Sequence, residues 1–298
     1  MGDYRSIIAA GIGLLLCTVA WADGFDGPPL LLESYDQKLQ SAVENRIQML
    51  GLTSAAVRKD LCLTLVDLSN PNEPRVAEIN GDHMMYAASL PKIAILLGAF
   101  VEIERGRMAL DMDTIESLTR MIRNSSNEDA TKMLNRVGKH RVNEILQSER
   151  FRLYDPLLNG GLWVGKEYAT GTAFKRDPIH NLSHGATALQ TARFFYMLDT
   201  QQLVSPKLTR MMKEMLGNPG IEHKFVKGLS DRPGVKIYRK SGTWRDWHAD
   251  SAIVEAGGGR RYILTALAKD PAGGEWLSGL AASLHDLIAP TRLATADR

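Results

Sequence analysis

The sequence predicts an α+β protein: a mostly antiparallel sheet, flanked by N- and C-terminal helices, with an all-helical lobe inserted into it. Strand patterns occur early, at residues 61–68 and 75–79, and again late, within residues 235–269. Between them, apolar residues recur mainly at helical spacing. Strands that come first and last, with helices between, favour one sheet built from both ends of the chain.

The first part of the sheet is expected after one amphipathic helix. Residues 31–50 are predicted to be helical because apolar residues recur there at helical spacing, at Leu39, Val43, Ile47 and Leu50. Residues 61–68 (LCLTLVDL) form a strand pattern. A turn with two prolines follows, and residues 75–79 return as a second strand.

The middle of the chain is predicted to be mainly helical. A long helix is expected to start at Ser89 and to run to about Arg105, with Pro91 tolerated in its first turn. Residues 151–183 are rich in glycine and aromatic residues and only weakly periodic, and a connection of this length is usually functional. Further helices are predicted at residues 113–123, 127–137, 141–147, 186–198 and 206–216.

The end of the chain returns to strands. Residues 235–240 form one strand pattern, and residues 249–255 and 262–269 form a hairpin around a glycine-rich turn. A helix at 275–288 closes the fold. We therefore predict one catalytic domain over residues 23–298, with its α/β part at about 23–88 and 200–298 and its helical lobe at about 89–199.

The N-terminus predicts export. A short start with Arg5 precedes the apolar run of residues 6–20, and Ala20-Trp21-Ala22 forms a small-x-small cleavage pattern. Residues 1–22 are predicted to be a signal peptide, which places the mature protein in the periplasm or outside the cell with no stable membrane anchor; an uncleaved anchor is the alternative. Cleavage leaves Cys62 as the single cysteine, so no intramolecular disulfide is expected and its thiol is expected to be buried packing.

Composition and charge exclude some partners. The 298 residues are 44% hydrophobic and 23% charged, which is ordinary for a globular protein. The net charge of +2 gives no electrostatic case for nucleic acid. We expect a monomer that acts on a small molecule.

The first chemical motif is Ser89-x-x-Lys92, before an apolar helical run. Residues three apart share a helix face, so the Lys92 amine can meet the Ser89 hydroxyl. Burial among the apolar residues that follow lowers the pKa of a lysine, which can then act as general base for a serine nucleophile. The Ser89 N–H, near a helix start, can stabilise an oxyanion. Taken alone, the motif is more simply a helix start capped by a serine, with an exposed lysine.

The second motif is Ser125-Ser126-Asn127, where a loop turns into a helix. The Ser125 hydroxyl can relay a proton to a leaving nitrogen, and the Asn127 amide can hold an amide substrate. The ordinary alternative is a helix cap formed by Ser126 or Asn127.

The third motif is Lys240-Ser241-Gly242-Thr243, placed at the end of a predicted strand. A lysine beside a serine hydroxyl can bind a carboxylate, and Gly242 lets the backbone approach a ligand closely. The Thr243 N–H can serve as a second oxyanion donor. An edge-strand lysine followed by a turn is the alternative.

The three motifs occur in one order, each in a fitting structural context. In this the chain resembles the serine β-lactamases and penicillin-binding proteins, whose motifs are S-x-x-K, S-D-N and K-T-G, and it is most similar to the class A β-lactamases. The resemblance implies that Ser89 is acylated with Lys92 as its base and Ser125 as proton relay. It further implies that Asn127, Lys240 and Ser241 bind substrate, and that the Ser89 and Thr243 amides form the oxyanion hole.

The resemblance also implies a deacylating carboxylate. Class A enzymes carry E-P-x-L-N on their omega loop, and this chain has Asp155-Pro156-Leu157-Leu158-Asn159. Asp155 is therefore the expected base, although its side chain is one methylene shorter than glutamate; Glu167 is a second candidate. An Asp-Pro turn without a catalytic role is the ordinary alternative for Asp155.

Three functions follow from these residues. The first is a serine β-lactamase, the second a D-alanyl-D-alanine peptidase acting on peptidoglycan stems, and the third a sensor that is acylated once. No cofactor is expected. His180 and His184 lack a third ligand, so we expect solvated histidines there and no metal site.

Overall fold

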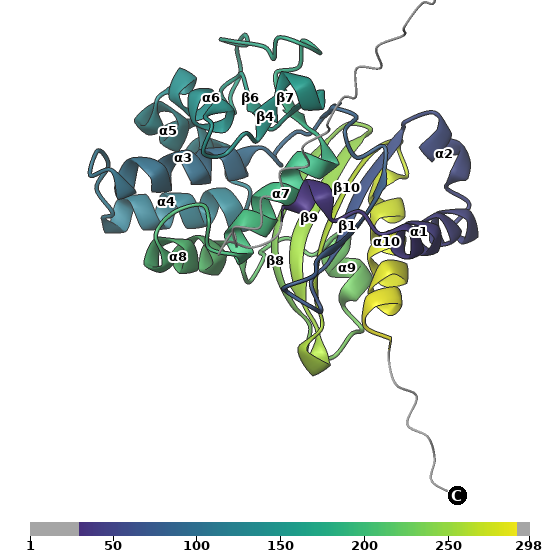
Figure 1. Cartoon of the computed structure of the whole chain (residues 1–298). Helices are drawn as coiled ribbons and strands as arrows, with labels where there is room; N and C mark the ends of the chain where they lie inside the picture. Colours follow the sequence, from purple (N-terminus) through teal and green to yellow (C-terminus); the bar gives the residue numbers. More distant parts are fainter. Residues whose placement is uncertain (1–29, 291–298) are drawn as a thin grey trace, which may run out of the picture.

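The computed structural model describes residues 30–290, which form a sheet covered by helices on both faces, with a group of helices beside it (Figure 1). The predicted signal peptide, residues 1–22, lies outside the described residues. Within residues 30–290, no helix is both long enough and apolar enough to cross a membrane.

The main sheet joins the two ends of the chain. Its strand order is β2-β1-β10-β9-β8, and every neighbouring pair is antiparallel. The central pair joins β1, from the first part of the chain, to β10, from the last, which confirms the predicted α+β class. The strand bounds are Leu61–Asp67 (β1), Arg75–Ile79 (β2), Lys236–Trp244 (β8), Trp247–Glu255 (β9) and Arg261–Lys269 (β10).

One face of the sheet is covered by the terminal helices. Alternate side chains of a strand point to opposite faces, and Leu61, Leu63 and Leu65 of β1 enter the core that this face shares with α1 and α10. The helices on this side are α1 (Gln37–Met49), α2 (Thr53–Val57), α9 (Phe225–Leu229) and α10 (Gly273–Ile288).

The opposite face meets the helical part of the chain. Cys62 and Val66 of β1 join this second core, which confirms the expected burial of the Cys62 thiol. The helix α3 lies at its centre and is apolar on all sides, as expected of a helix surrounded by others. The helices are α3 (Lys92–Glu104), α4 (Met112–Arg123), α5 (Asn127–Val137), α6 (Lys139–Gln147), α7 (Ala188–Asp199) and α8 (Pro206–Leu216).

Short strands hold the long connection, residues 151–183, beside the start of α3. β3, which directly precedes the Ser89 turn, pairs with β7, and β7 pairs with β6. The connection is therefore fixed by hydrogen bonds to the segment that carries Ser89. The bounds are Met85–Tyr86 (β3), Tyr154–Asp155 (β4), Gly160–Gly161 (β5), Trp163–Val164 (β6) and His184–Ala186 (β7), with 3-10 turns at Leu31–Glu33, Pro156–Leu158 and Gly257–Gly259.

Three predicted elements have different ends in the structure. The first helix starts at Gln37 rather than at residue 31, because the Asp36 carboxylate accepts from the Leu39 N–H and caps it. The helix expected from Ser89 begins at Lys92, since Ala88 is left-handed (φ 49°) and turns the chain. The strand expected at 235–240 continues to Trp244, so the third motif lies within β8 instead of at its end.

Candidate active site

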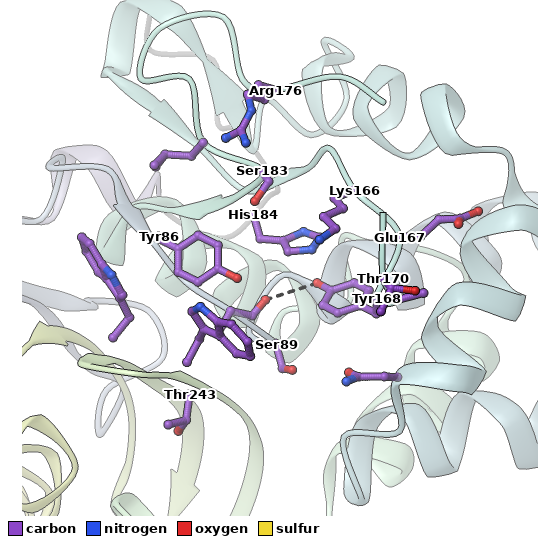
Figure 2. Close-up of a pocket in the computed structure, with 16 residues that line it drawn as sticks. Tyr86, Ser89, Lys166, Glu167, Tyr168, Thr170, Arg176, Ser183, His184 and Thr243 are labelled. Carbon is purple, nitrogen blue, oxygen red and sulfur yellow. Dashed lines mark hydrogen bonds between the residues drawn. The ribbon is translucent and has the colours of Figure 1, made fainter. Parts of the chain in front are cut away.

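A cavity of about 760 Å³ opens beside Ser89. Its walls come from the turn before α3, the start of α5, the end of β8 and residues 166–184 (Figure 2). Of the predicted residues, Ser89, Asn127, Thr243 and Glu167 line this cavity. The sequence motifs, which are far apart in the chain, therefore meet at one hollow.

The Ser89 turn is fixed by its neighbours. The Ala87 N–H donates to the His184 carbonyl oxygen at 3.0 Å, and the left-handed Ala88 turns the chain sharply into Ser89. A non-glycine residue in this conformation is strained by about 1 kcal/mol or more, and such strain persists only where the surroundings enforce it. The position of the Ser89 hydroxyl is thus set by tertiary contacts.

Gly242 packs against this turn. A Cβ added at Gly242 would lie 2.2 Å from the Ala87 carbonyl oxygen and 2.8 Å from the Ser89 nitrogen. Only a residue without a side chain allows β8 to pass so close to Ser89. This contact sets the spacing between the Ser89 and Thr243 backbones, as an oxyanion hole requires.

Lys92 is fully buried, and its amine contacts the second motif. The Nζ atom donates to the Ser125 carbonyl oxygen at 2.6 Å, to Asn127 Oδ1 at 2.7 Å and to Ser125 Oγ at 3.3 Å. Burial lowers the pKa of the Lys92 amine to about 7, so a large fraction of it is neutral at physiological pH. This is the lowered basicity that the sequence predicted.

Lys240 approaches Ser125 from the other side. Its buried Nζ donates to Ser125 Oγ at 3.0 Å and to the Ser241 carbonyl oxygen at 2.6 Å. Burial, reinforced by the charge of Lys92, holds the pKa of the Lys240 amine well below its ordinary value. Ser125 Oγ thus accepts from two lysines, which leaves its own O–H free to donate elsewhere.

The helix-cap interpretation of the second motif is correct for Ser126, and Ser125 has a different place. Ser126 Oγ accepts from the Asp129 N–H at 3.1 Å and caps α5, as its helix-cap alternative predicted. Ser125, one residue earlier, is left-handed (φ 56°), and its side chain meets the two lysines. The tight turn separates a structural serine from one placed for chemistry.

A further lysine, which the sequence analysis missed, supports β8 from behind. The buried Lys224 Nζ donates to the Gly242 carbonyl oxygen at 2.6 Å, to Thr243 Oγ1 at 2.7 Å and to the Ala249 carbonyl oxygen at 3.1 Å. These bonds hold the Gly242 and Thr243 peptides in place. Lys224 has no motif around it in the sequence, so only the fold reveals it.

Asp155 does not line the cavity. Its carboxylate accepts from the Leu157 N–H at 2.9 Å, which caps the short turn at Pro156, and it forms an ion pair with Arg152. Burial raises the pKa of this carboxyl, but those two contacts outweigh it and the pKa lies below its usual value. The geometry matches the Asp-Pro turn alternative.

Glu167 lines the cavity, but its carboxylate is engaged. It accepts from Lys139 Nζ at 2.7 Å and from Asn135 Nδ2 at 3.1 Å, and these contacts lower its pKa. Figure 2 shows the Glu167 side chain pointing away from Ser89. Of the acidic side chains in residues 30–290, it is the one that lines this cavity.

The side chain that faces Lys92 from the 166–184 wall is aromatic. The Tyr168 ring lies 4.6 Å from Lys92 Nζ and stacks on His184 at 4.3 Å between ring centroids, with its hydroxyl donating to the Ala88 carbonyl oxygen at 3.4 Å (Figure 2). His184 was expected to be solvated, but it is buried, and burial lowers its pKa to about 3. Its place in a strand under Tyr168 was not visible in the sequence.

The part of the chain that the structure describes contains no cluster of side chains suited to binding a metal ion. No group of three or more histidine, cysteine or acidic side chains is arranged to hold an ion among residues 30–290. His180 instead contacts Asn159, through its Nε2 at 3.0 Å from Oδ1.

The motif residues thus gather around one cavity on an α+β scaffold. The model of the beta-lactamase enzyme family (Beta-lactamase2) matches residues 42–117 and 113–288, so the chain belongs to this family. No curated protein sequence matches it significantly.

Solved structures share the fold at low identity. PBP-A is 17% identical, with a TM-score of 0.65 over 84% of this chain and 96% of its own. A β-lactamase from Sphaerobacter thermophilus is 15% identical, with a TM-score of 0.65 over 85% of this chain and 98% of its own. A class A β-lactamase of the last common ancestor of Gram-negative bacteria is 16% identical, with a TM-score of 0.64 over 83% and 99%. A variant of PBP-A has been solved as an acyl-enzyme with penicillin G.

Proposed function

We propose that this protein is a serine acyl-enzyme former that opens β-lactam rings at Ser89 and releases the acyl group slowly. In this it would act like a penicillin-binding protein with D-alanyl-D-alanine peptidase chemistry. The observation that carries the proposal is the Lys92–Ser125–Lys240 chain of contacts, which starts one helical turn after Ser89. The acyl-enzyme of a PBP-A variant with penicillin G supports the choice of ligand.

Acylation of Ser89 would use Lys92 as the base and Ser125 as the proton relay. Neutral Lys92 takes the proton of Ser89 Oγ, and Oγ attacks the carbonyl carbon of the lactam amide. The Ser89 and Thr243 N–H groups stabilise the resulting oxyanion. When the C–N bond breaks, the Ser125 hydroxyl gives its proton to the leaving nitrogen and regains one from Lys92. The product is an ester on Ser89 and a free amine.

Substrate orientation comes from β8 and α5. Lys240 and Ser241 of β8, with the Thr243 hydroxyl at the cavity wall, would bind the carboxylate on the leaving-group side. Asn127 Oδ1 accepts from Lys92, so its NH2 group is free to donate to the substrate amide.

We expect slow hydrolysis of the Ser89 ester because the candidate acidic side chains are paired with cations. A water molecule needs a nearby general base to attack the Ser89 ester efficiently. Asp155 is engaged with Arg152, and Glu167 with Lys139, which leaves no unpaired carboxylate at the cavity among the described residues. We therefore expect the ester to persist.

The test is time-resolved intact mass spectrometry after mixing the mature protein with penicillin G. We expect an adduct of the whole penicillin that outlasts the disappearance of free drug, and no adduct in Ser89→Ala. Ser54→Ala, at an exposed serine on α2, is the matched control and should label normally. Absence of any adduct in the unchanged protein would disprove the proposal.

An efficient β-lactamase is the second candidate, favoured by one observation: Glu167 lines the same cavity. In that case the adduct would form and clear as drug is consumed, and Glu167→Gln would trap it. Glu144→Gln, at an exposed acid on α6, should leave clearance unchanged. If Glu167→Gln does not lengthen the adduct lifetime, Glu167 is not the base.

Export belongs to the proposal as well. The leader pattern of residues 1–22 motivates it. Mass analysis of protein from the producing cell should show a chain that begins at Asp23, outside the cytoplasm. Recovery of a chain that still contains residues 1–22 would contradict cleavage.

A further inference from the structure

Two cationic side chains line the cavity on the side away from β8. They are Lys166 and Arg176, in the wall formed by residues 166–184. Figure 2 shows Arg176 and Ser183 above Ser89 and Thr243 below it, with Lys166 beside His184. Ser89 therefore lies between the groups of β8 and this second pair of cations.

Neither cation has an acidic partner among residues 30–290. Arg176 donates to the main-chain carbonyl oxygen of Asn181 at 3.0 Å, which is a neutral acceptor. Glu167, the acid beside them, forms its ion pair with Lys139. His184 has a pKa of about 3, so its ring is neutral near pH 7 and adds no positive charge. The buried Asp177, next to Arg176 in the chain, has its carboxylate bonded to the Ile179, His180 and Leu182 N–H groups and to the Tyr154 hydroxyl. This end of the cavity thus carries two cations that form no ion pair within the described residues.

Aromatic side chains line the space between the two ends. Tyr86 lies edge-on to Trp247, 6.1 Å apart between ring centroids, and tilted against His184 at 6.3 Å. Tyr168 stacks on the other side of His184. A ligand that reaches from Ser89 to Arg176 therefore crosses an apolar wall before it meets the cations.

We infer that Lys166 and Arg176 form a subsite for a second anionic group, so that the preferred acyl donor is dianionic. The inference rests on the proposed function. If Lys240, Ser241 and Thr243 hold the carboxylate of the leaving-group side, the acyl side chain lies on the opposite side of Ser89, toward residues 166–184. The preferred acyl group carries a carboxylate beyond a short apolar spacer.

A pair of probes with one charge of difference tests this subsite. 6-Aminopenicillanic acid is N-acylated with a glutaric half-acid or with the corresponding glutaramic group, which has the same length and no side-chain charge. The measured quantity is the second-order rate constant for Ser89 acylation, followed by intact mass. We expect the carboxylate probe to react about tenfold faster at low salt, as two partly exposed ion pairs would give.

Substitution of Lys166 and Arg176 tests whether these two side chains cause the difference between the probes. In Lys166→Met/Arg176→Gln the ratio of the two rates should fall to about one, because the anion has lost both partners. The matched control is Lys175→Met: Lys175 is exposed and adjacent to Arg176 but does not line the cavity, so the ratio should persist.

The outcomes separate the two proposals. Equal rates for the two probes in the unchanged protein, or a ratio that survives in the double variant, would overturn the subsite while leaving acylation at Ser89 intact. If neither probe labels Ser89, the proposed function itself is wrong, and the subsite inferred from it is withdrawn with it.

Discussion

In the region where α3, α5 and β8 meet, two buried lysines contact Ser125 directly. Residues 151–183 instead line the cavity beside Ser89 with the Tyr168 ring and with Glu167, whose carboxylate is paired with Lys139. The first region holds groups that can move protons and bind a carboxylate. The second holds no free base at the cavity in the described structure. Under the proposed function, the groups that form the acyl-enzyme all come from the first region, and that region is complete without a base from the second.

The largest expected effect is at Lys92. Replacing it with glutamine should lower the acylation rate about a hundredfold or more, because general-base catalysis contributes about 10² to 10⁴. In the unchanged protein the rate should rise about tenfold per pH unit below the Lys92 pKa of about 7, where the amine is mostly protonated, and level off above it. Intact-mass kinetics between about pH 5 and pH 9 would measure both. A pH-independent rate in the unchanged protein would contradict the role of Lys92.

Gly242 tests whether the contact between β8 and the Ser89 turn matters. Gly242→Ala should lower acylation about a hundredfold, because the new Cβ would lie 2.2 Å from the Ala87 carbonyl oxygen and displace the turn. Gly257→Ala is the matched control, since a Cβ there meets nothing within 4 Å. Equal acylation rates in the two variants, measured with penicillin G, would show that the spacing is not required.

The Asp155→Asn variant tests whether residues 151–183 supply a deacylating base. Asp155→Asn should leave the lifetime of the acyl-enzyme unchanged and lower the free energy of unfolding by about 1 kcal/mol, because it weakens the turn cap and the partly exposed pair with Arg152. Urea unfolding at neutral pH measures the loss. Asp246→Asn, at an exposed aspartate between β8 and β9, is the control.

The stability lost in Asp155→Asn is expected to depend on pH. The pKa of Asp155 is lowered in the folded state, so its stabilisation is present above the unfolded-state pKa and disappears as the pH falls through the folded-state value. The difference between the two proteins should therefore shrink in acid. A longer-lived adduct in Asp155→Asn would instead restore Asp155 as a deacylating base.

The smallest effect is expected at Ser126. Ser126→Ala removes the acceptor of the Asp129 N–H and should cost about 1 kcal/mol of stability, as loss of a helix cap typically does. Thermal unfolding would detect it. The loss should be partly recovered in Ser126→Asp, because aspartate is also a good cap. Equal stability of the alanine and aspartate variants would contradict the capping role.

Much of the acylating site could be predicted because each motif is local. The short spacing of Ser89 and Lys92, the loop before α5 and the Lys-Ser-Gly-Thr run each carry a residue-type pattern that the chemistry needs. The deacylating carboxylate could not be predicted in the same way. The segment with Asp155 fits the Pro, Leu and Asn positions of the motif, yet the Asp155 carboxylate forms an ion pair with Arg152, three residues earlier.

By itself the sequence determined the order of helices and strands and the motifs that supply the candidate site, because hydrophobic periodicity and short motifs depend on neighbouring positions. Only the tertiary structure decided which side chains face Ser89. Burial lowers the pKa of Lys92, and the close approach of β8 to the Ser89 turn requires Gly242. Contacts between residues far apart in the chain pair Glu167 with Lys139 and place the Tyr168 ring beside Lys92. These depend on contacts between residues far apart in the chain, which no local pattern specifies.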